Sequence, residues 1–91
     1  MLRTMTLEAE AVSVVKSGLE MKRKALELGV HQYKERLGVF EQKYQMNSKQ
    51  FATRYNLGEL GDNAEWVEWE YLLDALQETE RQLSLLQSVV L

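Results

Sequence analysis

Residues 46–65 read MNSKQFATRYNLGELGDNAE, and this segment decides the fold because it separates two long stretches of helical pattern. Asn47 can cap a short helix, and Gln50 stands three residues later, where the partner in a capping box belongs. Met46 and Phe51 occupy the two positions of a hydrophobic staple across the same cap. The segment therefore predicts that the chain turns before Asn47 and starts a short helix there.

The far end of this segment carries a stop signal followed by a second start signal. Gly58 can adopt the left-handed conformation that ends a helix. Asp62, with Glu65 three residues later, predicts a capping box for the last helix. Helices are therefore expected over about residues 6–45, 48–57 and 63–90.

Both long stretches have the apolar spacing of amphipathic helices, with steps of three, four and seven residues. The chain contains no proline, the residue that most strongly breaks helix interiors. We therefore expect one all-α domain over residues 1–91, in which a long helix, a short capped helix and a long helix form an antiparallel helical hairpin that associates into a dimer or larger bundle. A short strand is the alternative for residues 2–7.

The two long helices are unequal, and this inequality predicts association. At 1.5 Å per residue the first is roughly 60 Å long and the second roughly 40 Å, so the first overhangs by roughly 20 Å. Either a second chain covers the overhang, as in a symmetric dimer, or the helix breaks near Gly18 and folds back. On the first interpretation the self-association residues are Leu7, Val12, Val15, Leu19, Val89, Val90 and Leu91.

Composition excludes several classes of protein. The formal net charge of -3 is unlike that of a nucleic-acid binder, and the last helix opens with carboxylates, so DNA binding is not expected. With no cysteine, the chain cannot form disulfides or a zinc finger, which fits a reducing cytoplasm. No stretch approaches the roughly 18 apolar residues of a membrane span, and no signal-peptide pattern follows Arg3. We expect a cytoplasmic protein without membrane contact.

Charge is divided between the two halves of the chain. Residues 1–45 contain eight Lys/Arg and six Asp/Glu, whereas residues 46–91 contain three and eight. Antiparallel pairing would place Lys34 and Arg36 opposite the acidic residues Glu70, Asp74 and Glu78. The basic cluster Lys22-Arg23-Lys24 faces an uncharged stretch, and it either meets an acidic patch on another chain or is simply solvated.

The sequence offers little for catalysis or metal binding. His31 is the only histidine, and a lone surface histidine between Glu27 and Glu35 is more common than a metal ligand. Di-metal helical bundles use a Glu-x-x-His pair on each of two helices, and the chain has no such pair. We therefore expect no enzymatic activity, no catalytic residues, no cofactor and no metal.

Three aromatic residues near the start of the last helix are the candidate partner-binding residues: Trp66, Trp69 and Tyr71. Tryptophan and tyrosine are frequent anchors at protein interfaces. The alternative is that the indoles pack in the core at the closed end of the hairpin, against Phe40, Tyr44 and Phe51. Because the two tryptophans are three residues apart, one is expected inside the hairpin and the other on a partner.

Part of the sequence resembles small helical proteins of bacterial and archaeal toxin–antitoxin gene pairs. The resemblance covers about residues 20–88, and its specific part consists of Phe40-Glu41-Gln42-Lys43-Tyr44, Met46, Ser48, Phe51, Arg54-Tyr55, Gly58-Glu59-Leu60-Gly61-Asp62, Trp66, Glu68 and Trp69. It implies a cytoplasmic, non-enzymatic antitoxin-like protein that neutralises a partner protein, such as a cognate toxin, by covering it. The sequence has no evident DNA-binding module, so transcriptional autoregulation is not implied. The alternative function is a self-associating coiled-coil scaffold or adaptor.

Overall fold

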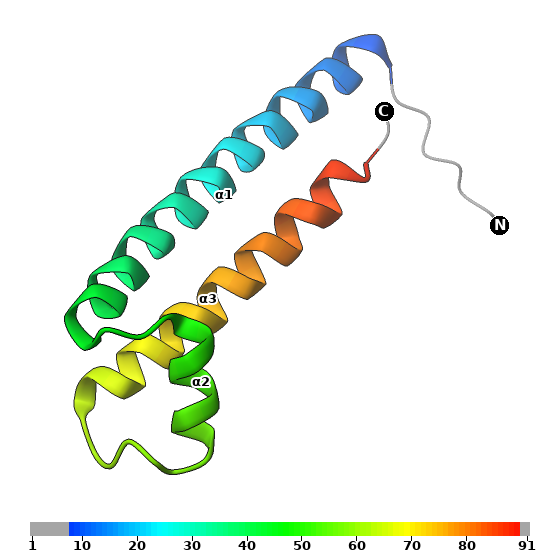
Figure 1. Cartoon of the computed structure of the whole chain (residues 1–91). Coiled ribbons are helices and arrows are strands. Elements are labelled where there is room, and N and C mark those ends of the chain that lie inside the picture. Colours follow the sequence, from blue (N-terminus) through cyan, green and yellow to red (C-terminus); the bar gives the residue numbers. More distant parts are fainter. Residues whose placement is uncertain (1–7, 90–91) are drawn as a thin grey trace, which may run out of the picture.

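The computed structural model describes residues 8–89 and confirms an all-α helical hairpin (Figure 1). The first long helix, α1, spans Ala9–Tyr44, the short helix α2 spans Ser48–Asn56, and α3 spans Ala64–Gln87. Helices α1 and α3 run antiparallel side by side, and α2 crosses them at the closed end of the hairpin (Figure 1). Residues 2–7, the alternative strand, lie outside the described residues.

The turn between α1 and α2 follows from the residues that the sequence places there. Gln45 adopts the left-handed conformation at φ 54°, which ends α1. Asn47 then forms the expected capping box: its side chain accepts from the Gln50 backbone N–H at 2.8 Å, and the Gln50 side chain accepts from the Asn47 N–H at 2.9 Å. The Glu41 carboxylate, near the end of α1, accepts from the Ser48 N–H at the start of α2 at 2.7 Å, so this bond joins the two helices across the turn.

Helix α2 ends as the sequence predicts, in a left-handed glycine. Gly58 has φ +73°, its N–H donates to the Tyr55 carbonyl, and the Glu59 N–H donates to the Arg54 carbonyl, each at 3.0 Å. These two bonds form a Schellman motif, which satisfies carbonyls that the end of a helix would otherwise leave free. The chain is thereby turned back toward the start of α3.

The cap of α3 differs from the expected one. Asn63, not Asp62, is the N-cap, and its side chain accepts from the Glu65 backbone N–H at 2.9 Å. With Asn63 as the N-cap, Glu65 is the second helical residue rather than the third, so it is not at the capping-box position. Its carboxylate accepts bonds from α1, from Lys43 Nζ at 2.6 Å and from the Tyr44 hydroxyl at 2.7 Å. The Glu65 side chain, which the local pattern assigned to the cap of α3, therefore makes long-range contacts with α1.

The core lies at the closed end of the hairpin, where all three helices meet. Trp69 is its centre: its indole stacks on Phe51 at 4.1 Å between ring centroids and on Phe40 at 5.5 Å. Buried aromatic pairs of this kind contribute about 0.5–1.5 kcal/mol beyond the area that they bury. The buried cluster is completed by Leu37, Trp66 and Leu72.

The open half of the hairpin is packed less tightly; it consists of residues 9–30 of α1 with residues 76–87 of α3 and the two residues that follow. Leu26 is its only buried side chain among the described residues. At Gly29 the two helices pass close to each other, and a Cβ there would lie in ordinary van der Waals contact with Thr79 Cγ2, at 3.6 Å. Helix α1 has 36 residues and α3 has 24, and α1 is continuous through Gly18. The helix break near Gly18 therefore does not occur. Helix α1 is about 18 Å longer than α3 at 1.5 Å per residue. Its N-terminal end extends past the end of α3 (Figure 1).

Candidate protein-binding surface

The structure places both predicted tryptophan anchors inside the chain. Trp69 is 0 % and Trp66 is 7 % exposed, and both belong to the core. Their polar atoms are satisfied internally, because Trp69 Nε1 donates to Ser48 Oγ at 2.9 Å and Trp66 Nε1 donates to the Leu60 carbonyl at 3.2 Å. Neither indole offers a surface to a partner in this fold.

The expectation that one indole points outward is therefore wrong. Residues three apart on a helix differ by only about 60° around its axis, so Trp66 and Trp69 share a face. That face is wide enough for two neighbours, and α2 supplies the second one: Phe51 contacts both indoles, with centroids at 5.6 Å from Trp66 and 4.1 Å from Trp69.

Tyr71, the third predicted anchor, lies on the surface and is 60 % exposed. It borders a shallow groove whose other lining residues come from α1: Gly29, Gln32, Tyr33, Glu35 and Arg36. Of the three aromatic residues, only Tyr71 presents its side chain where a partner could touch it.

The predicted self-association residues gather where α1 extends past α3. We call residues 9–19 of α1 the arm. Val12, Val15 and Leu19 fall at steps of three and four on the arm, on the face that α1 turns toward α3 further along. Val15 is 37 % exposed, Val89 at the end of α3 is 48 % exposed, and Leu19 and Val89 border the same shallow surface depression. Leu7, Val90 and Leu91 lie outside the described residues.

A second apolar surface on α1 was missed by the sequence reasoning. Val14 and Met21 are each 72 % exposed and Leu28 is 56 % exposed, at a constant spacing of seven residues. Gly18 and Ala25 lie between them and are also exposed. We call these five residues the outer stripe. A search for a second heptad beside the core-facing one would have found it, because seven residues return to nearly the same side of a helix.

Ion pairs between the long helices lie at the closed end. Arg36 pairs with Glu68 at 2.5 Å, rather than with the expected Glu70, and Lys43 pairs with Glu65 at 2.6 Å. The pKa of Glu65 is lowered, first by the hydrogen bond from Lys43 and then by the one from Tyr44, and the same Glu65 contact raises the pKa of Lys43. These exposed pairs fix the register of the hairpin more than they stabilise it.

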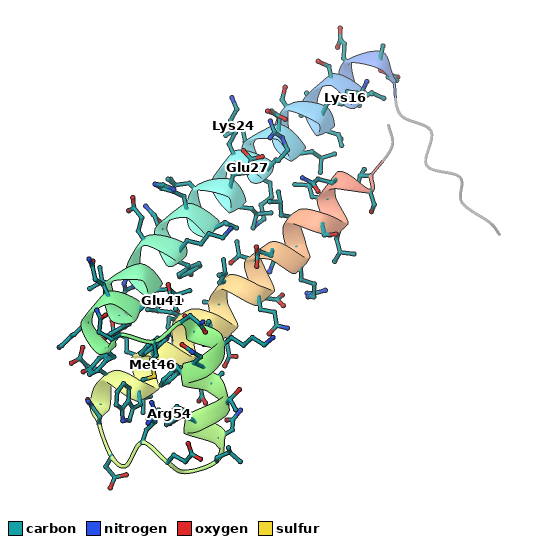
Figure 2. All side chains as sticks on the ribbon, viewed as in Figure 1. Lys16, Lys24, Glu27, Glu41, Met46 and Arg54 are labelled. Carbon is teal, nitrogen blue, oxygen red and sulfur yellow. The ribbon has the colours of Figure 1, made fainter. Side chains whose placement is uncertain are left out.

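The basic cluster Lys22-Arg23-Lys24 is partly neutralised within α1. Arg23 donates to Glu20 and to Glu27, which lie three and four residues away on the same helix. The charge that faces solvent there is therefore carried by Lys22 and Lys24. Figure 2 shows Lys24 projecting from α1 on the side away from α3.

The described residues contain no group of three or more His, Cys, Asp or Glu side chains that could hold a metal ion. His31 Nε2 lies 3.0 Å from a Glu35 carboxylate oxygen on an exposed surface of α1. Within residues 8–89, no helix is both long enough and apolar enough to cross a membrane.

The chain matches no known family model, no curated protein and no solved structure.

Proposed function

We propose that this chain is a non-enzymatic, cytoplasmic protein-binding module that acts like an antitoxin, neutralising a partner protein by covering it. The observation that carries the proposal is the arm: Val12 and Val15 continue the core-facing side of α1 past the end of α3, and Leu19 borders a depression with Leu86 and Val89 at that end. Full burial of a valine or leucine side chain is worth about 1.5–3 kcal/mol, so leaving three of them partly in water has a cost that a partner would remove.

The position of the core supports the proposal that the closed end of the hairpin stabilises the fold and the open half binds the partner. The aromatic cluster at the closed end holds the three helices together without help from another chain. Leu26 is the only buried side chain among the described residues of the open half, so a partner helix can pack there without displacing the core. A partner helix that packs along the arm and against Val89 would continue the line of α3 and cover the core-facing side of the arm.

The test is co-expression of the chain with the short reading frames that neighbour its gene, followed by co-purification and a growth assay. A neighbour that arrests growth alone, is rescued by this chain and co-purifies with it is the expected result. Val15→Asp places a charge on the arm's core-facing side and should abolish both effects. Ser13→Asp, an exposed position on another side of the arm, should leave both intact.

The proposal fails if no neighbour co-purifies and none is rescued. It also fails if Val15→Asp binds and rescues as well as the unchanged chain, because the arm would then not be the contact.

The outer stripe favours a second candidate function, a self-associating helical scaffold. Val14, Met21 and Leu28 are exposed on a different side of α1 from the arm's core-facing residues. A protein that self-associates through the outer stripe would keep its oligomeric state in the Val15→Asp variant, which separates this function from partner covering.

A further inference from the structure

A groove lies at the closed end of the hairpin, along the turn between α1 and α2. Its volume is about 400 Å³, and its lining residues are Gln45, Met46, Lys49, Gln50, Thr53 and Arg54. We call it the α2 groove. Figure 2 shows Met46 and Arg54 at this end of the molecule, whereas the arm lies at the open end (Figure 1). The α2 groove is therefore separate from the surface on which the proposed function rests.

The wall of the α2 groove is mostly apolar. Met46 is half-buried and packs against the aromatic core, and Arg54 Nη1 lies 3.9 Å from Met46 Sδ. Lys49 and Arg54 can line a groove with the carbon stems of their side chains while the charged ends stay in water. A wall of this kind can hold one leucine or phenylalanine side chain of another molecule.

The charge of the α2 groove is positive. Lys49 and Arg54 are among its six lining residues, and none of the six is acidic. Residues 46–91 contain only three Lys/Arg in all, so two of the three stand here. Within residues 8–89, Lys49 makes no ion pair. Arg54 lies 3.7 Å from Glu59, and both side chains are about half exposed, so this pair is weak and can exchange for another carboxylate.

Neighbouring grooves do not share this combination of charge and apolar wall. The groove beside Tyr71 contains Glu35 as well as Arg36. A depression next to the α2 groove contains Glu41, but the Glu41 carboxylate is already bonded to the Ser48 N–H. The positive charge is thus local, in a chain whose formal net charge is -3.

The backbone at Gln45 gives a second, independent observation. Gln45 has φ 54°, a left-handed conformation that glycine adopts at less cost. Its side chain nevertheless lines the α2 groove, and its Nε2 donates to the Gln42 carbonyl at 2.6 Å. Residues in such sparsely populated conformations are concentrated at binding sites. The chain therefore has a long side chain in the wall of the groove at a position where glycine would be less strained.

We infer that the α2 groove binds an acidic segment of a partner protein, with an apolar side chain of that segment against Met46 and its carboxylates paired with Lys49 and Arg54. Complementary charge favours an acidic occupant. A nucleic acid would need a longer basic track than two cations, and it would gain little from an apolar wall. One apolar contact and two exposed ion pairs give a weak complex, with a dissociation constant on the order of 100 µM.

A phage-displayed library of random peptides tests which chemistry the α2 groove selects. The library is first passed over the Thr53→Trp chain, in which an indole at an exposed position of α2 fills the groove, and then over the unchanged chain. Far-UV circular dichroism checks that Thr53→Trp stays helical. The peptides that only the unchanged chain retains should combine Asp or Glu with Leu, Phe or Trp. A retained set that is empty, basic or without apolar residues would overturn the inference.

Fluorescence anisotropy with one labelled synthetic peptide from the retained set tests the two cations. Lys49→Glu combined with Arg54→Glu should raise the dissociation constant about tenfold or more, because two attractions become repulsions. The matched control, Lys22→Glu with Lys24→Glu, makes the same change in net charge at exposed positions on α1 and should leave affinity unchanged. Val15→Asp should also leave it unchanged, so that a failure of the arm and a failure of the α2 groove give different results.

Methionine-methyl NMR locates the peptide on the chain. The Met46 methyl signal should shift on titration with the peptide, whereas the signal of Met21, 72 % exposed on α1, should stay in place. A shift at Met21 without one at Met46, or equal affinity in the two charge-reversed variants, would contradict the assignment. Displacement of the peptide by a single-stranded DNA oligonucleotide would overturn it in favour of a nucleic-acid site.

Discussion

Replacing Trp69 by alanine removes the largest side chain that the structure buries completely. The indole stacks on Phe51 at 4.1 Å and on Phe40 at 5.5 Å, and its Nε1 donates to Ser48 Oγ at 2.9 Å. Truncating a buried Trp or Phe to alanine costs about 3–5 kcal/mol. Domains of this size are stable by about 5–15 kcal/mol, so Trp69→Ala should remove a large fraction of the free energy of unfolding.

Urea denaturation followed by circular dichroism at 222 nm measures this loss at a fixed chain concentration, without relying on tryptophan fluorescence. With an m-value of about 2 kcal/mol/M, a loss of about 4 kcal/mol moves the midpoint down by about 2 M. Trp69→Phe keeps a stacked ring and should lose about 1–2 kcal/mol. Tyr71→Ala, at a 60 % exposed position, should change stability by less than about 0.5 kcal/mol. A loss below about 1 kcal/mol for Trp69→Ala would refute the assignment of this indole to the core.

Three further predictions concern the turns and the closed end. Gly58→Ala should lower the free energy of unfolding by about 1 kcal/mol because φ there is +73°. Gly38→Ala should raise it by about 1 kcal/mol, because Gly38 lies in a helix and a Cβ there would meet open space. In thermal unfolding the first variant should melt at a lower temperature than the unchanged chain and the second at a higher one. Asn47→Ala breaks the capping box of α2 and should cost about 1 kcal/mol in urea denaturation. Lys43 and Tyr44 hold the folded-state pKa of Glu65 below 4.5. The ionised Glu65 carboxylate therefore stabilises the fold above pH 4.5, and this stabilisation is lost as the pH falls through the lowered pKa. Between about pH 6 and pH 3 the free energy of unfolding of Glu65→Gln should fall less than that of the unchanged chain.

Local patterns predicted the turns because the interactions involved are local. The Asn47 capping box joins residues three apart, and the Gly58 conformation depends on the backbone of one residue. Such contacts form wherever the sequence places them, whatever lies on the other side of the molecule. The sequence left open whether the first helix breaks near Gly18. The structure shows a continuous α1, in which a glycine weakens a helix of 36 residues without ending it.

The errors arise where a distant residue competes with a local pattern. The local pattern assigns Glu65 to a cap of α3, but Lys43 and Tyr44 on α1 take its carboxylate, and Asn63 caps the helix instead. The spacing of Trp66 and Trp69 predicts one indole inside and one outside only if α1 is their sole neighbour. Helix α2 covers the rest of their shared face.

By itself the sequence predicted the three helices and the places where the chain turns, because periodicity, caps and glycine conformations are properties of neighbouring residues. Only the tertiary structure decided which apolar residues are covered. It buried Trp66 and Trp69 and left Tyr71, Val14 and Met21 exposed. Burial depends on which helices meet across the hairpin, and α2 and α3 together can cover the closed end of α1 but not its arm or its outer stripe.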